Sequence, residues 1–251
     1  MKKDLGSAAW RSLTGLKLVP DNNSGTDTAA FVQLDPGFAA LINLKHITTP
    51  FRTQPLDNTG NRVLKRAVDI SLSVVTIVAV LSWLIPVIAV IIKLTSRGPV
   101  FFLQQRNKRN GGLFTCIKFR SMIVNEDADI LPAEKDDRRI TSFGKFLRNH
   151  YLDELPQFFN VLWGDMSVVG PRPHMVSDNI SYDCLIKNYA YRHKVKPGIT
   201  GLAQVLGFVG PVDEIQKLEA RVNIDIFYVR HWSPTLDWVI FHRTIKKIMK
   251  G

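Results

Sequence analysis

The feature that most constrains this chain is residues 70–92, an uninterrupted run without a charged residue. About 20 predominantly apolar residues in a helix are enough to cross a ~30 Å hydrocarbon layer. A buried core helix is the alternative, but uncharged runs of this length favour a membrane. We therefore expect a membrane-associated helix, to which the rest of the fold must attach.

Basic residues flank both ends of this run. Lys65 and Arg66 precede it, and Lys93 and Arg97 follow it. The positive-inside rule places both ends in the cytoplasm, which a straight span cannot satisfy. A helix that enters, bends at Pro86 and returns satisfies it, since proline removes a helix hydrogen bond and kinks the chain. On the residues alone, a kinked single span remains an alternative.

The net charge of the chain indicates the class of partner that it can bind. A formal net charge of +11 suits anionic partners such as nucleic acid, an acidic membrane face or phosphorylated substrates.

Residues 1–60 are rich in Asp, Asn, Thr, Gly and Pro and carry only short apolar runs, of which residues 16–19 are predicted to form a strand. We expect residues 1–60 to be a poorly ordered arm or the remnant of an upstream domain.

Two strand-like segments, residues 100–106 and 113–120, flank Asn110-Gly111-Gly112, a typical hairpin turn. The period of two along a strand places Lys118 and Arg120 on one face. They are candidates for a phosphate clamp or a lipid-headgroup contact, and a solvated basic strand is the plainer alternative. Aromatic residues between basic ones also suit single-stranded nucleic acid.

Two adjacent acids, Asp153 and Glu154, lie between leucines and are closed by Pro156. Acids often sit at a helix N-terminus, where they complement the helix dipole. The alternative is a nucleophile beside a metal ligand, because an Asp carboxylate can attack phosphorus and a Glu can hold Mg²⁺. The pair by itself leaves both interpretations open. Arg148 lies within reach of the pair if the intervening turn is tight.

A helix is expected to begin at Ser233-Pro234, a cap residue followed by a first-turn proline. Apolar, aromatic and basic side chains then mix along residues 236–250. This mixture is typical of a helix lying in a membrane interface. An ordinary core helix fits the pattern equally well.

Several motifs follow one another in a fixed order: LKRAVDI at 64–70, GPVFF at 98–102, KFRSM at 118–122, LDELPQFFNV at 152–161, GDMSVVGPRP at 164–173, VKPGITGLAQV at 195–205 and WSPTLD at 232–237. Over about residues 60–251 the chain resembles the bacterial sugar transferases, which are polyprenyl-phosphate phosphoglycosyl transferases with one membrane-associated helix. It is most similar to exopolysaccharide-type undecaprenyl-phosphate glucose or galactose phosphotransferases.

The resemblance implies a mostly helical α+β fold. A re-entrant membrane helix broken at Pro86, a small β-hairpin and interfacial amphipathic helices would surround an active site at the cytoplasmic face. Residues 61–99 would form the membrane-associated part and residues 100–251 the catalytic domain. Longer family members carry an upstream domain, and residues 1–60 look like its tail.

The resemblance also implies a reaction. A sugar-1-phosphate would pass from a UDP-sugar to undecaprenyl phosphate through a covalent phosphosugar-aspartate, giving polyprenyl-diphosphate-sugar and UMP, the first membrane step of exopolysaccharide, O-antigen or capsule synthesis. Asp153 would be the nucleophile, and Glu154 would bind Mg²⁺. The expected phosphate-binding cations are Lys118, Arg120, Arg172 and, from its position in the chain, Arg148.

The expected partners are the UDP-sugar, undecaprenyl phosphate and anionic lipid at the cytoplasmic face of the inner membrane. A homodimer is allowed, and nucleic acid is not expected. Two alternative hypotheses for the function remain. One is a non-catalytic or impaired member, because Leu206 and Val209 replace an asparagine and an arginine usual in relatives. The other is a basic membrane-bound nucleic-acid-binding protein.

Overall fold

The computed structural model describes residues 17–19, 31–33, 54–125, 137–210 and 215–250. Contacts divide the chain into two units, residues 1–53 and 54–251. In the first, β1 (Lys17–Val19) pairs antiparallel with β2 (Phe31–Gln33), as expected for a strand at residues 16–19. Most of the arm predicted over residues 1–60 lies outside the described residues.

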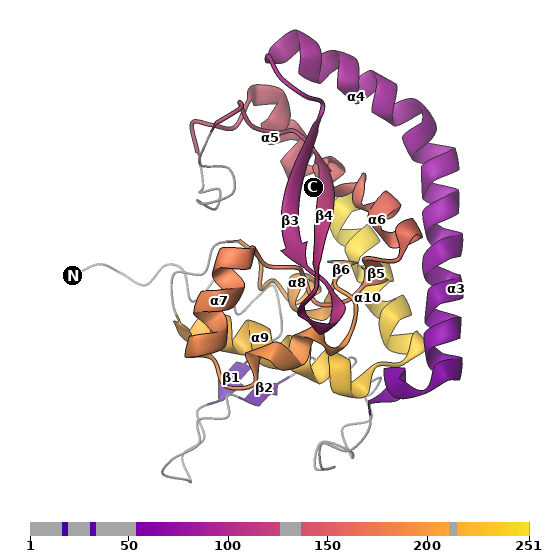
Figure 1. The fold of residues 1–251 in the computed structure, drawn as a ribbon, viewed down its shortest axis with the longest axis vertical. Coiled ribbons are helices and arrows are strands. Elements are labelled where there is room, and N and C mark those ends of the chain that lie inside the picture. Colours follow the sequence, from indigo (N-terminus) through magenta and orange to yellow (C-terminus); the bar gives the residue numbers. More distant parts are fainter. Residues whose placement is uncertain (1–16, 20–30, 34–53, 126–136, 211–214, 251) are drawn as a thin grey trace, which may run out of the picture. The chain divides into compact units, whose positions relative to one another are not determined.

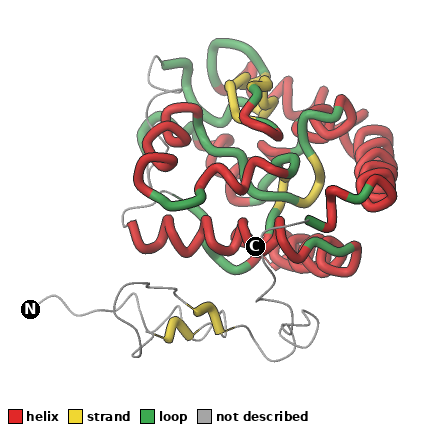
Figure 2. The backbone as a smooth tube through the Cα atoms, turned by 60° about the horizontal axis from the view of Figure 1, so that its bottom comes forward, coloured by secondary structure: helices red, strands yellow, loops and turns green. Residues whose placement is uncertain are grey.

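Helices dominate the second unit, and its strands are short (Figure 2). Strands β3 and β4 form an antiparallel hairpin, and β5 pairs parallel with β6. This confirms the expected mostly helical α+β class and the hairpin. The elements, in order, are η2 (Pro55–Asp57), α3 (Thr59–Thr76), η3 (Ile77–Leu81), α4 (Ser82–Thr95), β3 (Phe101–Asn107), η4 (Arg109–Gly111), β4 (Leu113–Phe119), α5 (Ser142–Asn149), η6 (Leu152–Glu154), α6 (Gln157–Trp163), β5 (Ser167–Val169), α7 (Val176–Leu185), η7 (Tyr189–Lys194), β6 (Gly198–Thr200), α8 (Leu202–Val205), α9 (Ile215–His231) and α10 (Pro234–Lys250).

One continuous helix, Thr59–Thr95, is long and apolar enough to cross a membrane. It comprises α3, the π-helical turn η3 and α4, and its axis changes direction between α3 and α4 (Figure 1). A π turn and a proline are the usual causes of such a bend. Pro86 lies one turn inside α4 and has no backbone N–H to donate.

Polar side chains in this bend bond to the backbone of their own helix. Ser82 Oγ donates to the Val78 carbonyl at 2.6 Å, and Trp83 Nε1 donates to the Ala79 carbonyl at 3.0 Å. Backbone polar groups in lipid need partners within the protein. These bonds therefore suit an irregular helix in an apolar environment.

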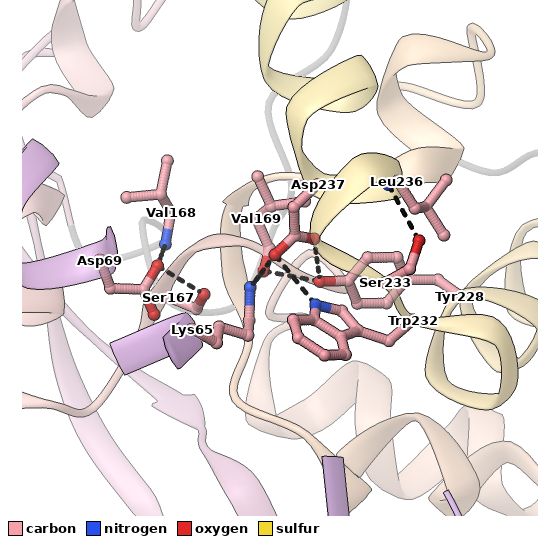
Figure 3. Close-up of polar contacts among 10 residues, drawn as sticks. All are labelled: Lys65, Asp69, Ser167, Val168, Val169, Tyr228, Trp232, Ser233, Leu236 and Asp237. Atoms are coloured by element: carbon pink, nitrogen blue, oxygen red, sulfur yellow. Dashed lines mark hydrogen bonds and ion pairs between the residues drawn. The ribbon is translucent and has the colours of Figure 1, made fainter. Parts of the chain in front are cut away.

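Two side chains attach the start of the long helix to the rest of the second unit. Arg66 donates to the Val161 and Leu162 carbonyls at 2.6 and 2.7 Å, in the last turn of α6. Asp69 is buried and accepts from Ser167 Oγ and Val168 N at 2.9 and 3.0 Å, beside β5 (Figure 3). These contacts fix α3 against α6 and β5.

A second attachment, the Asp237 cluster, consists of Lys65, Tyr228, Trp232 and Asp237. Asp237 accepts from Lys65 Nζ at 2.6 Å, from Tyr228 Oη at 2.7 Å and from Trp232 Nε1 at 2.9 Å (Figure 3). Three donors thus share one carboxylate. The cluster joins α3 to α9 and α10, which are distant in sequence.

The C-terminal end of the long helix also packs against the rest of the second unit. Ile88 and Ile92 form a buried cluster with Phe119 of β4 and Leu147 of α5. Both ends of Thr59–Thr95 therefore contact the body that also contains the acidic pair.

The C-terminal helix begins where the sequence predicts. Ser233 Oγ accepts from Leu236 N at 3.1 Å, so Ser233 caps α10 and Pro234 occupies its first turn. Ile240 is fully buried, whereas Trp238 and Met249 are largely exposed. The helix has an inner apolar face and exposed apolar side chains as well. Its predicted position in a membrane interface remains a prediction.

Candidate active site

The hairpin presents Lys118 to the site. Asn110 and Gly111 both have positive φ, 61° and 79°, which explains an Asn-Gly pair at this turn. Asn160 of α6 then ties the hairpin to the helix after the acidic pair. Its Oδ1 accepts from Ile117 N at 3.0 Å, and its Nδ2 donates to the Thr115 carbonyl at 2.7 Å. This places Lys118 beside the turn that holds the acids.

The acidic pair sits in a single 3₁₀ turn, η6. Tyr151, just before it, has a φ of 57°, an uncommon conformation for a non-glycine residue that sharply redirects the chain. Asp153 and Glu154 are both buried. The N-cap of the following α6 is Pro156, and no side chain caps that helix. Neither acid therefore caps α6 by a hydrogen bond, but both lie in the first turn of η6, where acids complement the helix dipole.

Glu154 is held by two cations. Its Oε1 accepts from Lys118 Nζ at 2.9 Å and from Arg172 Nη2 at 2.5 Å, and its Oε2 accepts from Arg172 Nη1 at 3.0 Å. Burial alone would raise the pKa of Glu154, but Arg172 and Lys118 outweigh it and hold that pKa well below its usual range. Glu154 is an ionised, ion-paired carboxylate.

Asp153 differs from its neighbour. Within the described residues its carboxylate has no hydrogen-bond or ion-pair partner. Burial and the adjacent Glu154 raise the pKa of Asp153, while the charges of Lys118, Arg148 and Arg172 act in the opposite direction. A carboxylate with free lone pairs and elevated basicity, surrounded by cations, is equipped to attack an anionic phosphorus centre.

The chain matches a known family over this whole region. Residues 60–251 match the model of the family described as "Bacterial sugar transferase". The chain belongs to this family.

Named relatives carry related activities. The chain is 50% identical over 199 residues to UDP-glucose:undecaprenyl-phosphate glucose-1-phosphate transferase of Klebsiella pneumoniae and 48% identical over 199 residues to that of Escherichia coli K12; each match covers 79% of this chain and 42% of the relative. It is 38% identical over 207 residues to undecaprenyl-phosphate galactose phosphotransferase of Salmonella typhimurium, covering 76% of this chain and 41% of the relative. The chain thus matches about two fifths of these relatives.

The predicted site residues do not all lie together. Lys118, Arg172, Asp153 and Glu154 lie together, and Arg148 acts on Asp153 through its charge. Pro86 lies in α4, within the long helix.

Arg120 lies elsewhere. It is buried and donates to the Ser96, Arg97 and Pro99 carbonyls at 3.0, 2.6 and 2.6 Å, in the segment leaving α4. Gly98 has a φ of +125°, and a Cβ there would lie 3.0 Å from the Arg120 guanidinium. The structure does not bring Arg120 together with Lys118 and Arg172, and its predicted phosphate contact remains a prediction.

Oxygen ligands for magnesium are partly present. Within the described ranges, no three His, Cys, Asp or Glu side chains gather as a metal site. Mg²⁺, however, is often held by one or two carboxylates plus substrate phosphates. A carboxylate has about four lone-pair sites, and Lys118 and Arg172 take three of those of Glu154. Glu154 and the adjacent Asp153 therefore fit an ion whose remaining ligands come from substrate.

Two residues that organise the site were missed in the sequence. Asn160 lies in an apolar helical run, where a buried amide needs partners, and that mismatch is the available signal. Arg192 is fully buried, pairs with Asp225 at 2.7 Å and donates to the Arg172 carbonyl at 2.6 Å. It lies in a basic run, residues 192–196, and charged residues of that kind are ordinarily found at the surface.

The family departures fall in two environments. Leu206 is buried, whereas Val209 is 45% exposed. The leucine is accommodated in the interior of the fold. The valine leaves an open position where the resemblance implies an arginine.

Proposed function

We propose that this protein transfers a sugar-1-phosphate from a UDP-sugar to undecaprenyl phosphate through a covalent intermediate on Asp153. The observation that carries the proposal is the contrast within the acidic pair. Glu154 accepts three hydrogen bonds from Lys118 and Arg172, whereas Asp153 has no partner within the described residues. The names of the relatives supply the donor and acceptor.

In the first step, an Asp153 carboxylate oxygen forms a bond to the sugar-bearing phosphorus. The bond from that phosphorus to the bridging oxygen breaks, and UMP leaves with the electron pair. In the second step, a phosphate oxygen of undecaprenyl phosphate attacks the same phosphorus. The Asp153–phosphorus bond breaks, the carboxylate is restored, and polyprenyl-diphosphate-sugar is formed.

The cations make this displacement feasible. A carboxylate and a diphosphate repel each other, and Lys118, Arg148 and Arg172 provide opposing charge beside Asp153. Magnesium held by Glu154 would supply additional neutralisation of the phosphate oxygens. Arg172 has a side chain that is 38% exposed, so it can contact a substrate phosphate while its carbonyl remains bonded to Arg192.

The long helix supports a position at the membrane. Both of its ends pack on the body that carries the site, and its axis bends between them (Figure 1). A helix that dips into the cytoplasmic leaflet and returns near Pro86 accounts for both features. Such a dip would place the acidic pair at the level of the lipid headgroups, where the lipid phosphate lies.

The decisive experiment separates the two half-reactions. Purified protein in detergent is incubated with UDP-glucose and Mg²⁺ but without undecaprenyl phosphate. We expect about one equivalent of UMP per enzyme and a matching hexose-phosphate mass on the peptide containing Asp153. If UMP appears only after lipid is added and no adduct forms, the covalent step is wrong.

The sugar itself is proposed as glucose, because the two most similar relatives above are named for it. The galactose-specific name of another relative makes UDP-galactose the competitor. Parallel assays with both nucleotide sugars at equal concentration decide the point. A higher kcat/KM for UDP-galactose would overturn the glucose assignment.

A further inference from the structure

Behind Arg172 lies a buried polar group that the proposed transfer does not use. We call it the His174 cluster, and it consists of His174, Asn179, Tyr189, Arg192 and Arg221. His174 follows Arg172 by two residues, and Arg192 donates to the Arg172 carbonyl at 2.6 Å. The cluster is therefore directly connected to the residue that holds Glu154.

The hydrogen bonds of the cluster determine where its protons lie. Asn179 Nδ2 donates to the Met175 carbonyl at 2.9 Å, which leaves Asn179 Oδ1 facing Tyr189. The Tyr189 hydroxyl must donate its single proton to that oxygen, at 2.5 Å. The Tyr189 oxygen is then an acceptor for Arg192 Nη1 at 3.3 Å and for His174 Nδ1 at 2.7 Å.

His174 therefore carries its proton on Nδ1. Burial and the charges of Arg192, Arg221 and Arg106 lower the pKa of His174 well below its usual value, so the ring is neutral. Its Nε2 is a bare lone pair. That atom is buried, and no described residue donates to it.

Arg221 has a buried N–H donor that lacks an acceptor. Its Nη2 donates to the Gly210 carbonyl at 3.0 Å, but its Nε–H is buried and meets no acceptor among the described residues. Its neighbours in α9, Leu218 and Val222, form one buried cluster with Tyr189, whose hydroxyl accepts from His174 Nδ1, so Arg221 and His174 lie in the same part of the fold. An acceptor without a donor and a donor without an acceptor thus occur in the same cluster. Buried polar groups left in this state are costly and call for a partner.

The chemistry of these two atoms restricts the partner. A phosphate oxygen is an acceptor and cannot satisfy His174 Nε2, although it suits Arg172 and Lys118. The partner needs a donor next to an acceptor. In a UDP-sugar the edge of uracil offers that combination, because N3–H lies between two carbonyls. The hydroxyls of the ribose and of the hexose offer it as well, and methylation of uracil N3 distinguishes uracil from them. Cytosine lacks the proton on N3. A single buried water also has a donor and an acceptor, and it is the competing occupant.

We propose that His174 and Arg221 recognise the uracil of the sugar nucleotide, with His174 Nε2 accepting from ring N3–H and Arg221 Nε donating to a neighbouring carbonyl. This inference rests on the proposed function. It places the nucleoside behind Arg172, the diphosphate at Arg172 and Lys118, and the reacting phosphorus at Asp153. Both atoms are shielded from solvent, so uracil reaches them only when the side chains around the half-exposed Arg172 part.

The test combines an enzyme variant with a substrate variant, using the full chain in detergent with undecaprenyl phosphate and Mg²⁺. UDP-glucose is compared with the same compound methylated at uracil N3, for the wild type and for His174→Phe. We expect methylation to lower kcat/KM of the wild type by about 10- to 100-fold, as for a lost hydrogen bond to a buried group. His174→Phe should lose a similar factor with UDP-glucose and be nearly insensitive to methylation.

Matched controls keep the test decisive. Tyr182→Phe retains the ring that packs edge-on against His174, with centroids 5.5 Å apart, and leaves His174 Nε2 in place. This variant should therefore stay sensitive to methylation.

If His174→Phe does not fold, Arg221→Met serves instead. Its kcat/KM for UDP-glucose should fall by a similar factor, and its preference for UDP-glucose over CDP-glucose should be smaller than that of the wild type. Equal sensitivity of the wild type and His174→Phe to methylation, or unchanged nucleotide preference in the Arg221 variant, would leave water as the occupant and overturn the proposal. Absence of UMP release from unmodified UDP-glucose by the wild type would instead refute the proposed function.

Discussion

Two carboxylates in this molecule show how similar residues acquire different uses. Asp237 accepts three hydrogen bonds, from Lys65, Tyr228 and Trp232, and it joins the long helix to α9 and α10. Asp153 is also buried and lies near cations, but it accepts no hydrogen bond from the described residues. A buried carboxylate that accepts several hydrogen bonds stabilises a fold. One that accepts none and lies beside positive charge is available for chemistry.

The strongest way to break this comparison is Asp153→Asn. We expect turnover to fall by on the order of 10⁴-fold or more, as for loss of a catalytic nucleophile. The melting temperature should not fall, because burial already disfavours the charged form of Asp153. UMP release and thermal unfolding on the same preparation check both parts. Activity within tenfold of wild type would remove Asp153 from its assigned role.

The converse change is Asp237→Asn. It leaves Lys65 largely buried without a carboxylate, and we expect the free energy of unfolding to fall by about 2–4 kcal/mol. Activity per folded molecule should stay within a few fold. Denaturant unfolding in detergent measures the first quantity. Asp165→Asn is the matched control, because its pair with Lys108 is more exposed than the Lys65–Asp237 pair and should contribute at most about 1 kcal/mol. Equal losses for the two variants would contradict the assignment.

The pH dependence of activity sharpens the comparison. In the proposed mechanism Asp153 reacts as the carboxylate, and burial together with Glu154 raises the pKa of Asp153. Activity should therefore fall as pH decreases through a midpoint above the usual aspartate range. Lys118→Met removes a charge that lowers this pKa, so the midpoint of kcat/KM should move to higher pH. Lys108→Met, which does not face Asp153, should leave it in place. A shift to lower pH in the Lys118 variant would refute the account.

The smallest expected catalytic effect belongs to Arg120. An ammonium group cannot reproduce three guanidinium bonds to the Ser96, Arg97 and Pro99 carbonyls, so Arg120→Lys should cost about 1–3 kcal/mol of stability. The KM for UDP-sugar should change by less than about threefold, a discrimination below 1 kcal/mol. Unfolding and steady-state kinetics check these values together. A large rise in KM at unchanged stability would restore the phosphate contact predicted from the sequence.

The sequence alone determined the local features. The uncharged run at residues 70–92 predicts a long apolar helix, the Asn-Gly turn predicts the hairpin, and Ser233-Pro234 predicts the start of α10. Motif order was sufficient for the family. These signals depend on neighbours in the chain, where periodicity, capping and turn chemistry operate.

Tertiary structure decided which polar side chains share a site. Lys118 and Arg120 are two residues apart, at the end of β4 and just after it, yet Lys118 binds Glu154 and Arg120 binds the segment leaving α4. Asn160 and Arg192 were inconspicuous in the sequence and hold the site in place. The physical reason is that hydrogen bonding and burial depend on distances in space between residues far apart in the chain, which no local pattern encodes.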